Sequence, residues 1–215
     1  MSANTTPAVG PYGVLSFLLQ YPDAGMLGER DALDAAVEAI EARSVREPIQ
    51  AFLADWSDRP LDELCAHYVE TFDFDRRASL HLTFHLFGDR RDRGSALARL
   101  KRRYSDAGLP MGDRELPDYL PAMLEFAELA EADSGVATLN EMREPIELVH
   151  ARLVDSGSPY AHLLKALRAG LPRLTSDQEE EIRRLALEGP PSEEVGLEPF
   201  GAEETMPHLV NGAAS

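Results

Sequence analysis

Apolar side chains recur at helical spacing along most of the chain. The clearest run has steps of 3, 4, 3 and 4 residues, which places its members on one helix face; these are Leu139, Met142, Ile146, Val149 and Leu153. Pro145 falls inside this run, so we expect a kink there or a division into two helices. No convincing alternation of Val, Ile and Thr suggests a strand. The pattern therefore predicts an all-α protein.

Turn and capping residues divide the periodic pattern into about nine or ten helices. Pro60 and Pro159 suit first helical positions, whereas Gly88 and Gly108 suit helix ends. The predicted helical segments are 12–22, 26–43, 46–58, 59–72, 79–87, 91–108, 118–131, 139–153, 158–172 and 175–189. These segments predict a single-domain helical bundle.

The composition changes near residue 189. Residues 175–215 contain ten acidic and two basic side chains, a net charge of −8, and the part after 189 is rich in Pro, Gly and Glu without a period. Such a segment cannot bury enough apolar surface to fold alone. We therefore expect a flexible N-terminus (1–9), one helical domain (10–188) and a disordered acidic C-terminal tail (189–215). The spacing of Ser176 and Glu179 predicts a capping box that opens the last helix.

The remaining composition is typical of a soluble globular protein, with 44% apolar and 27% charged residues among 215. The single cysteine, Cys65, cannot form an internal disulfide, which favours a reducing compartment. The N-terminus lacks the basic start of a secretory signal. Its longest apolar run, "VLSFLL", is far shorter than the about 20 residues that cross a bilayer. We expect a cytoplasmic protein without stable membrane association.

The net charge of −17 opposes binding to phosphate backbones unless the basic residues cluster. They do cluster: residues 88–103 hold seven basic and two acidic side chains, a net charge of +5. One interpretation is a helical nucleic-acid-binding regulator that uses residues 90–103. Because no aromatic side chains that would stack on bases are interleaved there, an ordinary solvated helix face is the favoured interpretation, and we expect no nucleic-acid partner.

Candidate catalytic residues are few. His81 and His85 stand four apart on a predicted helix, but a zinc protease of the HExxH type needs Glu where this chain has Leu82. No third ligand stands at a suitable spacing, so two partly buried histidines are the preferred interpretation. Cys65 lies on the apolar face of its helix, as a small core residue does. Phosphate-loop and nucleophile-elbow motifs are absent from the sequence. We expect no enzymatic activity, no metal and no cofactor.

Two short stretches combine aromatic rings with carboxylates: residues 68–75, "YVETFDFD", and residues 115–121, "ELPDYLP". Carboxylates beside exposed aromatic rings suit a basic, partly apolar peptide, because arginines pair with the carboxylates and apolar side chains meet the rings. The competing interpretation is helix capping combined with core packing. The residues alone leave both open.

The stretches "YVETFDFDRRASLHLTFHLFGDRRDRGSALARLKRRYSDAG" and "ELPDYLPAMLEF" closely resemble the NarJ-type, or delta-type, assembly chaperones of membrane-bound respiratory nitrate reductase. These belong with the DmsD/TorD group of redox-enzyme maturation chaperones. The likeness is dense over residues 68–126. It extends more loosely from "LSFLLQYPD" to about residue 170.

The resemblance implies an all-α fold that needs no cofactor to form, and a system-specific chaperone absent from the finished enzyme. Its implied partner is the apo form of the nitrate reductase catalytic (alpha) subunit, bound through that subunit's N-terminal leader. The chaperone would support molybdenum cofactor insertion and delay membrane docking. We expect a monomer or weak dimer. The short Glu-Pro-Asp-His motif of TorD and DmsD is not found here, so their functional residues are not transferred.

Together, composition and resemblance predict a client-peptide site with a groove, acidic groups and arginines. An amphipathic leader helix would lay its apolar face in the groove and its basic end on the carboxylates. Arg90 and Arg93 are further arginines that would orient carboxylates or touch acidic parts of the client. The predicted site residues are Tyr68, Glu70, Phe72, Asp73, Asp75, Arg76, Arg77, Leu80, Phe84, Glu115, Asp118 and Tyr119.

Overall fold

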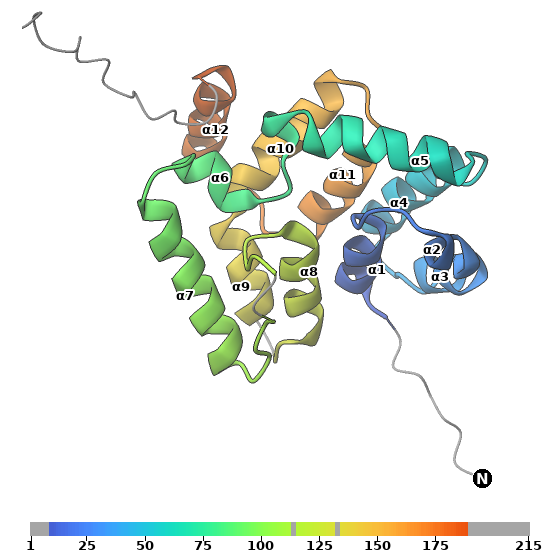
Figure 1. The fold of residues 1–215 in the computed structure, drawn as a ribbon, viewed down its shortest axis with the longest axis horizontal. Coiled ribbons are helices and arrows are strands. Elements are labelled where there is room, and N and C mark those ends of the chain that lie inside the picture. Colours follow the sequence, from blue (N-terminus) through green and yellow to red (C-terminus); the bar gives the residue numbers. More distant parts are fainter. Residues whose placement is uncertain (1–8, 113–114, 132–133, 189–215) are drawn as a thin grey trace, which may run out of the picture.

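A computed structural model describes residues 9–112, 115–131 and 134–188; within these ranges the chain forms twelve α-helices and no β-strand (Figure 1). The first six are α1 Pro11–Leu18, α2 Ala24–Gly28, α3 Arg30–Glu38, α4 Arg43–Trp56, α5 Leu61–Tyr68 and α6 Leu82–Phe87. The others are α7 Asp92–Asp106, α8 Leu120–Leu129, α9 Ser134–Glu141, α10 Arg143–Asp155, α11 Tyr160–Gly170 and α12 Ser176–Glu188. The all-α prediction is confirmed, with more helices than expected because residues 26–43 divide between α2 and α3 and the run around Pro145 divides between α9 and α10.

The core lies where α4, α11, α10 and α1 meet. Helix α11 packs along α4, and α1 packs along α8, which in turn contacts α9. From α4 and α11 the fully buried side chains include Ile49, Phe52, Leu163 and Leu167, with no exposed surface. Burial of each such side chain contributes about 1.5–3 kcal/mol relative to exposure in water. The helical periodicity in the sequence thus corresponds to real inward faces.

The long amphipathic run is divided near its proline, as predicted. Helix α9 ends at Glu141, and Met142 precedes α10, in which Pro145 occupies the first turn. A proline is tolerated there because the first amide groups of a helix have no intrahelical acceptor. The two helices still share one apolar face, since Leu139, Ile146 and Val149 are all fully buried.

Two glycine stops are also confirmed. Gly88 ends α6 with φ of 57°, and Gly108 follows α7 with φ of 76°. Side chains with a Cβ atom avoid this left-handed region, which explains why glycine stands at both ends.

The chain between α5 and α6 is irregular and carries much of the predicted site. Helix α5 continues into one π-helical turn, η1 (Val69–Asp73), and a short 3-10 turn follows, η2 (Arg76–Ala78). The Asp75 carboxylate accepts a hydrogen bond from the N–H of Arg77 at 3.0 Å and caps η2. Single π-helical turns are often found at functional sites.

An isolated antiparallel β-bridge joins His81 to Tyr119. The N–H of Leu82 donates to the Asp118 carbonyl at 2.9 Å, and the N–H of Leu120 donates to the Leu80 carbonyl at 2.8 Å. The expectation that His81 is helical is therefore wrong. Because the bridge holds it in extended conformation, α6 begins only at Leu82.

The last helix begins one residue earlier than its predicted capping box implies. Thr175 Oγ1 accepts from the N–H of Gln178 at 3.3 Å, and Gln178 Oε1 accepts from the N–H of Thr175 at 2.9 Å. This reciprocal pair is a capping box, shifted from the predicted Ser176 and Glu179.

The predicted tail, 189–215, and residues 1–8 of the predicted flexible N-terminus lie outside the described residues. Among the helices described, none is long and apolar enough to cross a bilayer.

Candidate functional site: an aromatic and acidic surface

Asp118, a predicted site residue, is completely buried beside the β-bridge. Its carboxylate lies 3.2 Å from His81 Nδ1 and 3.3 Å from Arg93 Nη2. It also accepts hydrogen bonds from the hydroxyl and the N–H of Thr83. Burial alone would raise the pKa of Asp118, but the hydrogen bonds from His81 and Thr83 and the nearby positive charges lower it overall. Asp118 is therefore a charged group that holds two chain segments together, and its carboxylate is not exposed at the surface.

The two histidines have different hydrogen-bond partners. His81 pairs with Asp118, whereas His85 Nε2 lies 2.8 Å from the carbonyl oxygen of Ser79. Burial lowers the pKa of His85, so its ring is neutral at pH 7. Within the described ranges no group of three or more potential ligands is placed to hold a metal ion.

The apolar members of the predicted groove are inside the protein. Tyr68, Phe72, Leu80 and Phe84 expose only 5%, 6%, 3% and 9% of their surface. The Phe72 ring packs 4.8 Å from that of Tyr68 and 4.8 Å from that of Tyr160. Core packing is therefore their main role in this structure, as the competing interpretation of the sequence holds. Their participation in peptide binding stays a prediction, and it requires movement or action through exposed neighbours.

The neighbours of these buried rings are exposed. Glu70 and Asp73 on η1 are exposed, and Phe74, which directly follows η1, exposes 80% of its surface. Tyr119 is half-buried, and Tyr21, which follows α1, is 51% exposed. We call these five residues the aromatic–acidic surface.

The buried Tyr68 connects the parts of this surface. Its hydroxyl lies 3.0 Å from the Tyr119 hydroxyl and donates to the Leu19 carbonyl at 3.1 Å. Its ring meets the Tyr21 ring edge-on at 5.5 Å. Burial is the main cause of the raised pKa of Tyr68 and of Tyr119, and the negative charge of Asp73 raises both further. Asp73 thus lies within electrostatic range of both phenols.

The predicted carboxylate Asp75 is already paired. It accepts a hydrogen bond from Arg152 on α10 in addition to the one from Arg77 N–H. Burial alone would raise the pKa of Asp75, but these two hydrogen bonds lower it overall. Asp75 therefore ties η2 to α10, and Arg152 already neutralises the charge that it would offer to a client's basic group.

The arginines mostly serve internal contacts. Arg76 pairs with Asp89 at 2.9 Å, and its guanidinium lies 4.7 Å from the centre of the Phe84 ring. Arg93 orients one predicted carboxylate, Asp118, as proposed from the sequence. Arg90 donates to the carbonyl oxygen of Phe87. Arg77 has an exposed side chain close in sequence to the aromatic–acidic surface.

The second predicted stretch of rings and carboxylates, residues 115–121, divides into three parts. Tyr119 belongs to the aromatic–acidic surface, and Asp118 lies buried beneath it. Glu115 is exposed, but it lines a separate pocket of about 260 Å³ together with Tyr104 and Phe126. The structure therefore does not bring Glu115 together with Asp73.

Tyr21 was not predicted as a site residue, and Cys65 was predicted to lie deeper in the core than it does. Tyr21 stands just before Pro22, which ends the predicted helix. An aromatic residue at such a position, outside the apolar face, indicates an exposed ring and could have pointed to the site. Cys65 is half-buried, and its Sγ lies 3.3 Å from the Pro22 carbonyl oxygen, so it lies at the edge of the core.

Comparisons with known proteins agree on one family. The family model described as "Nitrate reductase delta subunit" matches residues 31–166. "Probable nitrate reductase molybdenum cofactor assembly chaperone NarJ" of Bacillus subtilis is 34% identical over 171 residues, covering 80% of this chain and 93% of the relative. "Nitrate reductase molybdenum cofactor assembly chaperone NarJ" of Escherichia coli K12 is 35% identical over 157 residues, covering 72% of this chain and 66% of the relative.

A third relative has a different organisation. "Nitrate reductase-like protein NarX" of Mycobacterium tuberculosis H37Rv is 34% identical over 156 residues, which are 71% of this chain but only 23% of the relative. The matched part is thus one section of a much longer protein. The family model covers Glu70, Asp73, Phe74 and Tyr119, whereas Tyr21 precedes it. With the family match spanning more than half of its length, this chain belongs to the nitrate reductase delta subunit family.

Proposed function

We propose that this protein is a cytoplasmic assembly chaperone for a respiratory nitrate reductase. It binds the N-terminal segment of the apo catalytic subunit and supports molybdenum cofactor insertion before the enzyme docks at the membrane. It is not itself an enzyme or part of the finished complex. The names of the Bacillus subtilis and Escherichia coli relatives, both molybdenum cofactor assembly chaperones, support the role.

One observation supports the client site best: the aromatic–acidic surface exposes rings and carboxylates side by side. Phe74 and Tyr21 offer apolar area to a peptide, and Asp73 and Glu70 offer unpaired charge, since no ion pair joins either carboxylate to another described residue. A guanidinium gains charge-assisted hydrogen bonds from a carboxylate and a favourable contact with a ring face. The surface thus fits a basic, amphipathic leader.

The test is calorimetric titration of the full chain with a peptide that matches the N-terminus of its organism's nitrate reductase catalytic subunit. We expect Asp73→Asn to weaken binding about tenfold or more, because one charge-assisted hydrogen bond contributes about 1.5–3 kcal/mol. Phe74→Ser should weaken binding about tenfold as well, because it removes an apolar contact and a ring face for a guanidinium. Asp58→Asn removes an equally exposed carboxylate outside the aromatic–acidic surface and serves as the control. Unchanged affinity in both test variants would refute the site.

The role is tested separately from the site. In a strain that lacks this chain but makes all nitrate reductase subunits, we expect the catalytic subunit to contain little molybdenum, and the restored chain to recover it. Full cofactor content without the chain would refute the role. Recovery of cofactor content by the Asp73→Asn and Phe74→Ser variants would leave the role intact and move the client contact elsewhere.

The nucleic-acid alternative rests on the basic cluster. Five of its members are exposed, namely Arg90, Arg91, Arg99, Lys101 and Arg102, while Arg93 and Arg103 form ion pairs. Retention on heparin at physiological salt, lost in an Arg99→Glu/Arg102→Glu variant, would favour this alternative. Passage through the heparin column without retention would exclude the nucleic-acid alternative, because contacts to phosphate groups dominate the binding of proteins to nucleic acids.

A further inference from the structure

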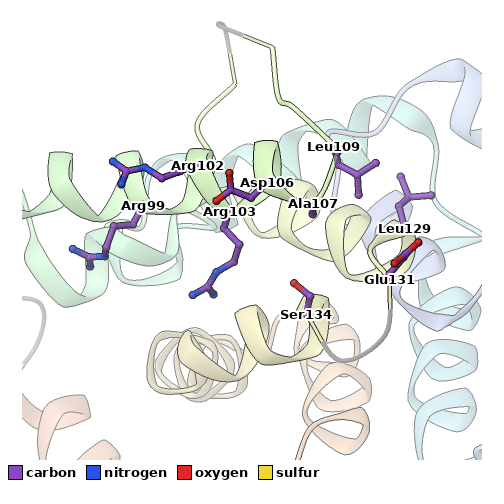
Figure 2. A pocket seen from close by; sticks show the side chains of 10 residues that line it. Arg99, Arg102, Arg103, Asp106, Ala107, Leu109, Leu129, Glu131 and Ser134 are labelled. Atoms are coloured by element: carbon purple, nitrogen blue, oxygen red, sulfur yellow. The ribbon is translucent and has the colours of Figure 1, made fainter.

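Helix α7 forms one wall of an open pocket of about 920 Å³ (Figure 2). Arg99, Arg102, Arg103 and Asp106 follow each other at spacings of three, one and three residues, which places them on one face of the helix. Opposite them lie the end of α8, with Leu129, and the start of α9. None of these residues belongs to the aromatic–acidic surface.

Two of the three arginines have no counter-ion among the described residues. Arg103 pairs with Glu141 at 2.8 Å and donates to the Thr138 hydroxyl at 3.1 Å. Arg99 and Arg102 are exposed, and neither has a hydrogen bond or ion pair with another described residue. Two cations with no partner in the described part of the chain stand out in a protein whose net charge is −17.

The pocket also has an apolar end. Leu129 is 59% exposed and Leu109 is half-buried. Figure 2 shows both leucines at one end and Arg99 at the other, with Glu131 beside Leu129. The positive charge is therefore confined to the arginine end, and the pocket fits a segment that carries carboxylates and large apolar side chains together.

The chain itself contains such a segment. Residues 193–204, "EEVGLEPFGAEE", hold five glutamates, no lysine or arginine, and three large apolar residues, Val195, Leu197 and Phe200. This combination is complementary to two free arginines and two accessible leucines. In contrast, the aromatic–acidic surface carries carboxylates and would repel it.

The segment is joined to the described domain by a short stretch of chain. The described chain ends at Glu188 in α12, which packs on α10, and α10 in turn contacts α6, the neighbour of α7. From Glu188 to Phe200 the chain can span up to about 40 Å, close to the diameter of a domain of this size. A tether whose typical length matches the span to the pocket gives an effective concentration of the order of millimolar, which favours docking through weak contacts.

We propose that residues 193–204 dock in the α7 pocket of the same molecule. Their glutamates pair with Arg99 and Arg102, and Leu197 and Phe200 cover Leu109 and Leu129. The segment is then an internal ligand, and any acidic, apolar partner of this pocket must displace it. The proposal does not depend on the client site.

The test is the rate at which chymotrypsin cleaves the full chain after Phe200, since a docked segment cannot enter the protease. In Arg99→Glu/Arg102→Glu we expect cleavage to be faster by about threefold or more, given millimolar tethering. The matched control is Arg90→Glu/Arg91→Glu, which makes the same charge change outside the pocket. Its rate should stay that of the parent chain. Circular dichroism confirms that each variant is folded.

A second variant leaves the folded domain untouched. By itself, the Glu198→Lys/Glu203→Lys variant should be cleaved faster than the parent chain. When it is combined with Arg99→Glu/Arg102→Glu, the opposite charges are restored with reversed signs, and cleavage should be slow again. Equal rates in all variants overturn the proposal. Protection that grows with protein concentration also overturns it, because the segment would then occupy a second copy. Binding of a synthetic acidic peptide to the pocket, with equal cleavage rates throughout, assigns the pocket to another chain and refutes self-docking.

Discussion

Nδ1 of His81 lies 3.2 Å from a carboxylate oxygen of Asp118, a side chain with no exposed surface. This contact joins two stretches of chain that are 37 residues apart and that both contribute to the predicted client site. Arg93, which also contacts the Asp118 carboxylate, comes from a third element, α7. The position of Tyr119, the next residue, therefore depends on a buried charge network.

The first prediction concerns that network. Asp118→Asn keeps the size of the side chain but removes its charge, leaving Arg93 without a counter-ion. We expect the free energy of unfolding to fall by about 2–4 kcal/mol, as for other broken buried pairs. Asp89→Asn, which breaks the exposed pair with Arg76, should change it by less than about 0.5 kcal/mol. Urea unfolding at pH 7 measures both, and a loss below about 1 kcal/mol for Asp118→Asn would contradict the prediction.

The second prediction concerns acid stability. Burial, aided by the positive charge of Arg168, lowers the pKa of His150 from 6.5 to about 4. Between these values the folded protein keeps this ring neutral while the unfolded chain binds a proton, so stability is lost as the pH falls from about 6.5 towards 4. His150→Gln should flatten this part of the stability curve. His162→Gln, at an exposed position, is the control; equal curves for His150→Gln and the parent chain would disprove the assignment.

A third prediction separates the two phenylalanines of the predicted site. Phe72→Ala should lower the free energy of unfolding by about 3–5 kcal/mol, because its ring is buried among Tyr68 and Tyr160. Phe74→Ser should leave it within about 0.5 kcal/mol, because its ring is 80% exposed. Thermal unfolding compares the two. A large loss in the Phe74 variant would show that this ring is part of the core and not of a free surface.

The fourth prediction uses two helical glycines. A Cβ atom on Gly135 of α9 would collide with the backbone of Ala127 on α8, lying 3.0 Å from its carbonyl oxygen. We therefore expect Gly135→Ala to destabilise the protein by about 1–3 kcal/mol. A Cβ atom on Gly94 of α7 meets nothing within 4 Å, so Gly94→Ala should stabilise the protein by about 0.5–1 kcal/mol. Urea unfolding of the two variants should give opposite signs, and equal signs would contradict the packing of α8 on α9.

The sequence was most informative where local chemistry decides the structure. The division near Pro145 and the helix ends at Gly88 and Gly108 follow from backbone restrictions that act within a few residues. The start of α6 was predicted wrongly because a partner 38 residues away holds His81 extended. A local sequence pattern cannot predict a backbone contact between residues so far apart in the chain.

The same limit applies to the candidate site. The sequence located the mixture of rings and carboxylates in residues 68–75, but it did not show which rings turn inward. Phe72 and Phe74 stand two residues apart, and side chains two apart on a helical turn point in nearly opposite directions, so that one packs on Tyr160 while the other is exposed. Tyr21 joins the surface only through its tertiary contact with Tyr68.

The bridge between His81 and Tyr119 also has a dynamic consequence. Its two backbone hydrogen bonds, from Leu82 N–H and Leu120 N–H, close a loop that contains α6 and α7. A local opening of that loop breaks both bonds in a single event and frees Tyr119 from Tyr68. Deuterium uptake at these two amides would then follow one shared rate, and that rate would report how often the aromatic–acidic surface comes apart while the rest of the molecule stays folded.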